Sequence, residues 1–132
     1  MRRNPWRWTG LFVLTATLAF GDQTRVRDAE WTAPSDQAAR VNPLAGRMDA
    51  AGGGRKVFHQ RCAACHGAAG QGTPKGPDLS DRNVQAQADG ALFWKISQGN
   101  TRTGMPAFSL LPEPQRWQLV LHLRMLAATA AR

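Results

Sequence analysis

The apolar residues in the second half of the chain recur at the spacing of α-helices. In residues 89–100, Leu92, Phe93 and Ile96 form one apolar stripe, which predicts a short amphipathic helix. In residues 113–131 the apolar side chains cover more than one stripe, which predicts a longer helix with most of its surface buried. The apolar residues of this longer segment are Trp117, Leu119, Val120, Leu121, Leu123 and Leu126.

A third helix is predicted further toward the N-terminus. The sequence RKVFHQRCAACH at residues 55–66 has helical spacing, and the three glycines at 52–54 indicate a break before it. Asp89 is expected to cap the helix of residues 89–100, and Gly99 stands where that helix should stop.

Long loops rich in glycine and proline separate the predicted helices. They cover residues 67–83 and 101–114, and no segment of the chain has a convincing strand pattern. We therefore expect an all-α fold with a few short helices joined by long loops. Helices this short bury little apolar area between them, so a large flat cofactor would complete the core.

The N-terminal part of the chain differs in composition from the rest. Residues 1–21 combine a basic start, the short apolar run GLFVLTATLAFG and small residues near its end, which is typical of a secretory signal peptide. An uncleaved signal anchor is the alternative. Residues 22–51 form a polar leader that either drapes over the domain or acts as a linker, and residues 52–132 form the domain itself. This organisation predicts a periplasmic protein, free or anchored to the outer face of the inner membrane.

The charge of the chain narrows the choice of partners. The net charge is +8, and without residues 1–21 it becomes +5, from 14 basic and 9 acidic residues. The charges are scattered and form no run of five or six, which argues against nucleic-acid binding. A mildly cationic surface favours encounters with acidic protein partners.

The two cysteines of the chain are three positions apart, with a histidine directly behind the second, in CAACH at residues 62–66. A zinc site needs four ligands, and the two other histidines of the chain do not supply a second pair. His59 is interpreted as a solvated side chain. His122 is interpreted as a buried side chain or, if the chain binds haem, as a second haem ligand. A redox dithiol of the thioredoxin type needs a βαβ setting, which is absent. A disulfide inside Cys-x-x-Cys closes a loop too small to staple a domain.

Covalent attachment of haem needs this order of residues. The thiols of Cys62 and Cys65 would bond the two vinyl groups of the porphyrin, and His66 would reach the iron from the proximal side. Export agrees with this interpretation, because the attachment is performed outside the cytoplasm. We therefore expect one haem c, covalently bound through Cys62 and Cys65.

Met105 is the strongest candidate for the second axial iron ligand. It lies in the loop sequence TGMPAF, where Gly104 permits close backbone approach and Pro106 stiffens the chain. Methionine usually fills cores. A methionine between a glycine and a proline in a loop instead suits the role of iron ligand in the His/Met pattern of electron-transfer haems. Met125 is interpreted as packing within the last helix, and Met48 has no such frame.

Four motifs in combination resemble those of class I c-type cytochromes, the small monohaem cytochrome c domain proteins. They are GRKVFHQRCAACHG, GPDL, GNTRTGMPAF and RWQLVLHLRML, and the resemblance runs from about residue 52 to residue 127. The family folds as a few helices wrapped around one covalently bound haem. The resemblance thus implies the same fold and cofactor for this chain.

The resemblance also implies roles for single residues. The backbone carbonyl of Pro77 would accept a hydrogen bond from the proximal imidazole of His66, as groups behind metal ligands do. Leu79 would line the proximal face of the haem, and Met105 would be the distal ligand.

A helix crossing is implied as well. Gly54 and Phe58 resemble the small and aromatic pair at which the first and last helices of the family cross, with Leu119 and His122 facing them. Relatives often carry tyrosine where this chain has His122, which is the one departure in the motifs.

The function expected from these features is single-electron transfer between redox proteins, by a monomer that is not an enzyme. One alternative is a haem subunit docked on a periplasmic dehydrogenase or oxidase. A peroxidase-like haem enzyme is the other, although such relatives usually carry two haem motifs and this chain has one.

Two sets of residues are candidates for the surroundings of the haem. Lys75, Lys95 and Arg102 could form the basic encounter surface. Arg102, Asn100 and Trp94 could meet the haem propionates.

Overall fold

The computed structural model describes residues 31–130, and the predicted signal peptide at residues 1–21 lies outside this range. The elements in chain order are α2 (Ser35–Ala38), the 3₁₀-helix η1 (Met48–Ala50), α3 (Ala51–Arg61), α4 (Ala63–His66), α5 (Arg82–Gln85), α6 (Asp89–Gln98) and α7 (Glu113–Ala130). Within this range the only β-type pairings are two isolated bridges, so the expected all-α class is confirmed. No helix of the described part is long and apolar enough to cross a membrane.

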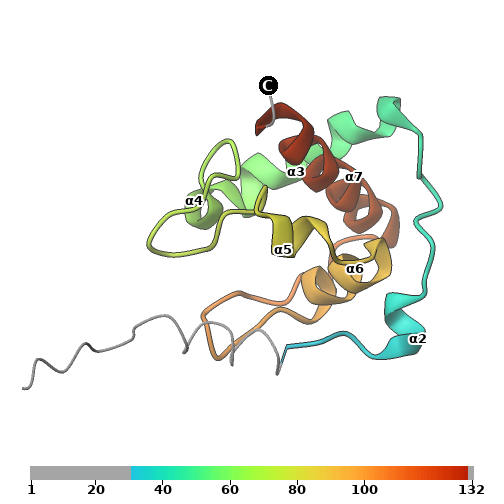
Figure 1. Cartoon of the computed structure of the whole chain (residues 1–132), viewed down its shortest axis with the longest axis horizontal. Helices are drawn as coiled ribbons and strands as arrows, with labels where there is room; N and C mark the ends of the chain where they lie inside the picture. The colour runs from blue at the N-terminus through green and yellow to red at the C-terminus, as the bar shows by residue number, and fades with distance from the viewer. Residues whose placement is uncertain (1–30, 131–132) are drawn as a thin grey trace, which may run out of the picture.

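Helices α3 and α7 cross at the centre of the molecule (Figure 1). The crossing is close because a Cβ atom added at Gly54 would overlap the backbone carbonyl of Gln118 on α7. Phe58, Leu119 and Val120 are fully buried at this crossing. The helix pair that the motifs implied is therefore present, and it sets the direction in which α3 approaches the cysteines.

Helix α3 begins at Ala51 and runs through the three glycines, where the sequence predicted a break. Glycine costs a helix about 1 kcal/mol relative to alanine, so the pattern alone argued against this start. Packing against α7 overrides that preference, because only a residue without a side chain fits at position 54. The expected break is thus wrong, and its cause is tertiary contact.

Helix α6 confirms the predicted stripe but not the predicted cap. Leu92, Phe93 and Ile96 are buried, and Gly99 ends the helix with φ 65°. Residue 88 is the N-cap and makes no side-chain capping bond, whereas Asp89 is the first helical residue and forms an ion pair with Arg124. The carboxylate that was expected to cap the helix therefore pairs with Arg124 of α7 instead.

The last helix confirms the predicted span, whereas the short helices α2 and α5 were not predicted. Trp117 and the leucines of α7 are buried, but Met125 is 38% exposed, so its interpretation as packing is wrong. Helix α5 lies in the predicted loop and is capped by Asp81, whose side chain accepts a hydrogen bond from the amide of Asn83.

Residues 31–50 lie along α6 and the start of α7 (Figure 1). We call this segment the strap. A Cβ at Gly90 would lie 2.7 Å from the carbonyl oxygens of Ala38 and Arg40, so strap and helix touch through their backbones. The guanidinium of Arg40 lies over the ring of Phe93 at 4.5 Å and pairs with Glu113 at 2.6 Å.

Candidate functional site

The two cysteines lie on the turn that joins α3 to α4. Cys62 ends α3 through its amide, which donates to the carbonyl of Phe58 at 2.8 Å, and its own carbonyl accepts from the amide of His66 at 2.9 Å. The spacing of the motif therefore becomes one tight turn that carries both thiols and the imidazole. Cys62 is half-buried, Cys65 is exposed, and both are free thiols.

Cys62 does not have the lowered pKa of a reactive redox thiol. Burial and, as the smaller cause, the charge of the neighbouring Cys65 together raise the pKa of Cys62 to about 11. Reactive cysteines work through a lowered pKa, because the thiolate is the nucleophile. Among residues 31–130 no group of three or more histidine, cysteine or acidic side chains is placed to hold a metal ion.

The imidazole of His66 is oriented by a backbone carbonyl. Its Nδ1 lies 2.9 Å from the carbonyl oxygen of Pro77, and an N–H at Nδ1 can donate to that oxygen. This tautomer leaves the lone pair of Nε2 for a metal. Gly76 permits the approach, because a Cβ there would lie 3.1 Å from Nδ1 of the ring.

The loop that carries Pro77 is tied down on both sides. The hydroxyl of Thr73 donates to the carbonyl of Cys65 at 2.5 Å. At the other end, the amide of Leu79 donates to the carbonyl of Gly70 at 2.7 Å, and the carbonyl of Leu79 accepts from Nε2 of Gln85 at 2.7 Å. Leu79 itself is half-buried and packs against the core.

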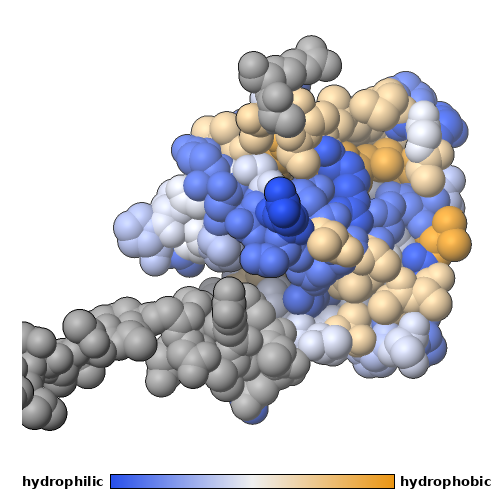
Figure 2. Space-filling model, in the orientation of Figure 1, coloured by the Kyte–Doolittle hydropathy of each residue, from blue (hydrophilic) through white to orange (hydrophobic). Residues whose placement is uncertain are grey.

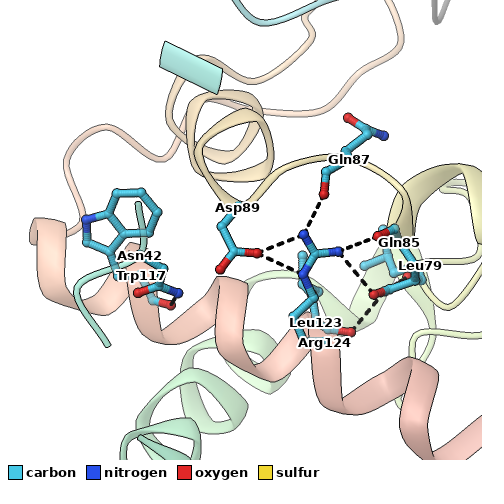
Figure 3. A network of polar contacts seen from close by, with 8 residues as sticks. All are labelled: Asn42, Leu79, Gln85, Gln87, Asp89, Trp117, Leu123 and Arg124. Carbon is cyan, nitrogen blue, oxygen red and sulfur yellow. Dashed lines mark hydrogen bonds and ion pairs between the residues drawn. The ribbon is translucent and has the colours of Figure 1, made fainter. Parts of the chain in front are cut away.

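Arg124 of α7 connects that helix to the start of α6 and to Gln85, the residue that holds the loop at Leu79 (Figure 3). Its guanidinium donates to Asp89 at 2.9 Å, to the carbonyl of Gln85 at 2.7 Å and to the carbonyl of Gln87 at 2.5 Å. Gln85 in turn donates to the carbonyl of Leu123 on α7 at 3.0 Å. The network was not found from the sequence, although an arginine within the apolar run of the last helix was a signal for it.

Met105 lies in a closed loop between α6 and α7. Its amide and carbonyl both pair with Asn100, at 3.0 and 2.9 Å, and this pairing shapes residues 100–105 into a compact turn. Met105 is half-buried, unlike Met48, which is 61% exposed. In Figure 1 the short helix α4, the loop between α4 and α5 and the loop between α6 and α7 lie on the same side of the molecule. The structure thus joins His66 to Pro77 and holds Met105 in a separate loop.

His122 lies in the α3/α7 crossing. Its ring centroid is 5.0 Å from that of Phe58, it is 7% exposed, and its Nε2 has no hydrogen-bond partner. Burial lowers the pKa of His122, and the charges of His59 and Arg55 lower it further. The side chain is therefore a buried histidine at the helix crossing, and His59 is exposed as expected.

The basic residues predicted for docking differ in their surroundings. Lys75 is exposed, whereas Lys95 is half-buried and holds its ammonium 4.6 Å from the ring centre of Trp31. The sequence did not predict this contact of Trp31. Figure 2 shows hydrophilic surface over α5 and its neighbours.

The residues present fit a covalently bound haem. Two free thiols and an imidazole share one turn, and the imidazole is held in the tautomer that a metal ligand needs. A thioether sulfur, which is the softer second ligand of His/Met haems, stands in a rigid loop.

The comparisons with known proteins agree with this fit. Residues 49–123 match the family model described as cytochrome C oxidase, cbb3-type, subunit III. A protein of Azospirillum sp. (strain B510), named Cbb3-type cytochrome c oxidase subunit CcoP, is 42% identical over 67 residues, which cover 42% of this chain and 23% of that protein. The chain therefore belongs to the cbb3-type cytochrome c oxidase subunit III family of c-type cytochrome domains, and its cofactor is haem c.

Proposed function

We propose that this chain carries single electrons through one haem c with His66 and Met105 as axial ligands. The observation that carries the proposal is the 2.9 Å contact between His66 Nδ1 and the Pro77 carbonyl. A hydrogen bond of this kind fixes the orientation of a metal-ligating histidine and raises its basicity. Cys62 and Cys65 would form the two thioether bonds.

The haem would supply an iron that cycles between the ferrous and ferric states. The residues of the chain have three tasks around it: they bind it covalently, hold both axial ligands, and leave one edge reachable. Ligation by a methionine sulfur favours the ferrous state and raises the reduction potential. With both axial positions filled by protein, no site remains for a substrate, which supports an electron carrier rather than an enzyme.

The partners are redox proteins, and two arrangements are open. In the first, the protein is a periplasmic monomer that meets partners with acidic docking surfaces, for which the exposed Lys75 and Arg102 are the cationic counterparts. In the second, the domain is a subunit of an oxidase complex. The similarity to a protein named as an oxidase subunit supports the second arrangement, although this chain covers only 23% of that protein.

The visible spectrum of the protein, made with the haem-attachment machinery, tests the ligands. Sharp c-type bands on reduction and a weak far-red band in the ferric form are expected. Met105→Ala should abolish the far-red band and leave the haem attached, and Met125→Ala is the matched control that should keep it. Loss of covalent haem in Cys62→Ala or Cys65→Ala tests the thioether bonds.

Carbon monoxide separates the electron carrier from the enzyme. Slow or weak binding to the ferrous protein is expected, because Met105 occupies the position that the gas needs. Rapid binding to the wild type would mean that the iron has an open site, and the peroxidase-like alternative would then replace the proposal. Co-purification of the chain with an oxidase from solubilised membranes would decide for the docked subunit.

A further inference from the structure

The strap makes a direct contact with the loop that carries Met105. The indole Nε1 of Trp31 donates a hydrogen bond to the carbonyl oxygen of Gly99 at 3.0 Å, across 68 positions of sequence. Gly99 follows α6 directly, and carbonyl groups at the end of a helix have no partner within the helix. Trp31 therefore satisfies a carbonyl at the point where the loop leaves the helix.

The backbone at Gly99 is tightly coupled to Met105. A Cβ at Gly99 would lie 2.5 Å from the carbonyl carbon of Pro106, so the two ends of the loop touch. The next residue, Asn100, exchanges two backbone hydrogen bonds with Met105, at 2.9 and 3.0 Å. A displacement of Gly99 would thus move Met105 without any flexible segment between them to absorb it.

Trp31 is itself held in place. Its ring lies under the ammonium of Lys95, 4.6 Å from the ring centre, and the strap continues through the buried Ala33 to the backbone contact at Gly90. Trp31 and residues 98–103 line one open hollow at the surface. Because the strap is fixed at both ends of α6, the indole N–H is oriented toward Gly99 before any ligand binds.

We propose that Trp31 is a positioning residue for the methionine ligand: its hydrogen bond holds the base of the 99–106 loop so that Met105 stays on the iron. This inference rests on the proposed His/Met ligation. It concerns a residue of the strap that lies outside residues 49–123, the region matched by the family.

Displacement of Met105 by added imidazole tests the inference. The ferric, haem-loaded full chain is titrated with imidazole while the far-red band is followed, in the wild type and in Trp31→Phe. Phenylalanine keeps a ring under Lys95 but has no N–H for Gly99. We expect imidazole to bind about fivefold more tightly to the variant, which is the change expected from losing one hydrogen bond.

Asn42→Ala is the matched control. Asn42 ties the strap to α7 by donating a buried hydrogen bond to the carbonyl of Trp117 at 3.4 Å, and this bond involves no residue of the 99–106 loop. Its removal should lower the denaturant midpoint of unfolding, as Trp31→Phe should, and leave imidazole binding within about twofold of the wild type.

Each other outcome overturns the inference. Unchanged imidazole binding in Trp31→Phe shows that the hydrogen bond does not hold the ligand. Equal tightening in Asn42→Ala shows a general loosening of the strap instead of a specific role for Trp31. A wild type without the far-red band, or a band that survives in Met105→Ala, overturns the proposed ligand and this inference together.

Discussion

Alanine at each of the three consecutive glycines of α3 tests the α3/α7 crossing. The same methyl group is added at positions 52, 53 and 54, and each change favours the helix by up to about 1 kcal/mol, because glycine is the poorer helix former. The space beyond the three Cα atoms differs, so the structure predicts three different free energies of unfolding.

Gly52 and Gly53 are the permissive positions. A Cβ at Gly52 meets nothing within 4 Å, so Gly52→Ala should stabilise the protein by about 0.5–1 kcal/mol. A Cβ at Gly53 meets the side-chain amide of Gln118, which is the far end of a flexible side chain and can turn away. Gly53→Ala should therefore lie within about 0.5 kcal/mol of the wild type.

Gly54 is the restrictive position. A Cβ there overlaps the carbonyl of Gln118 and lies 3.0 Å from the amide nitrogen of Leu119, and backbone atoms cannot turn away. The helices must separate by about 1 Å, which forfeits a quarter to a half of each dispersion contact across the crossing. Overpacking at this level costs about 3 kcal/mol, and the helix preference returns about 1 kcal/mol, so a net loss of about 2 kcal/mol is expected.

Guanidinium unfolding of the haem-loaded variants, followed by far-UV circular dichroism, gives the three values by linear extrapolation. Gly52→Ala is the control for the chemical change itself. If Gly54→Ala proved as stable as Gly52→Ala, the helices could not cross as closely as the structure has them, and the argument for the crossing would be refuted.

Three further substitutions test polar side chains at the contacts of α7 with α3 and α6. Arg124→Met removes three donors and should lower the free energy of unfolding in guanidinium by about 2 kcal/mol, because their acceptors are partly buried. Asp89→Asn keeps an acceptor oxygen and should cost less. A loss below about 0.5 kcal/mol in Arg124→Met would contradict the role of the network. Burial lowers the pKa of His122, so the folded protein binds fewer protons there than the unfolded chain does. The stability that this provides is complete above the unfolded pKa of about 6.5 and is lost as the pH falls below it. The drop in denaturant midpoint between pH 7.5 and pH 5.5 should therefore be smaller in His122→Phe, and an equal drop in both proteins would show that His122 does not titrate on unfolding.

Local patterns were sufficient for the helices that bury an apolar face. The spans of α6 and α7 follow from apolar spacing, glycine at the end of α6 and acidic residues at both starts, all of which act within a few residues. The order Cys-x-x-Cys-His likewise carries its chemistry locally, because both thiols and the imidazole must sit on one turn. The sequence could therefore indicate haem c before any contact was known.

Long-range contacts decided the features that local patterns got wrong or missed. The glycines at 52–54 predicted a break in the helix because helix propensity is a local quantity. In the structure α7 lies against the backbone of Gly54 and keeps the segment helical. Asp89 read as a cap because its partner, Arg124, is 35 positions away. No spacing rule connects residues so far apart.

The same distinction applies to the site. By itself the sequence determined the all-α class, the turn with its two thiols and imidazole, and the framed methionine, since each depends on neighbouring residues. Only the tertiary structure decided that Trp31 meets Gly99 and that Arg124 and Gln85 support Leu79. These contacts depend on how the helices pack, because the packing brings a donor to a carbonyl that its own segment leaves without a partner.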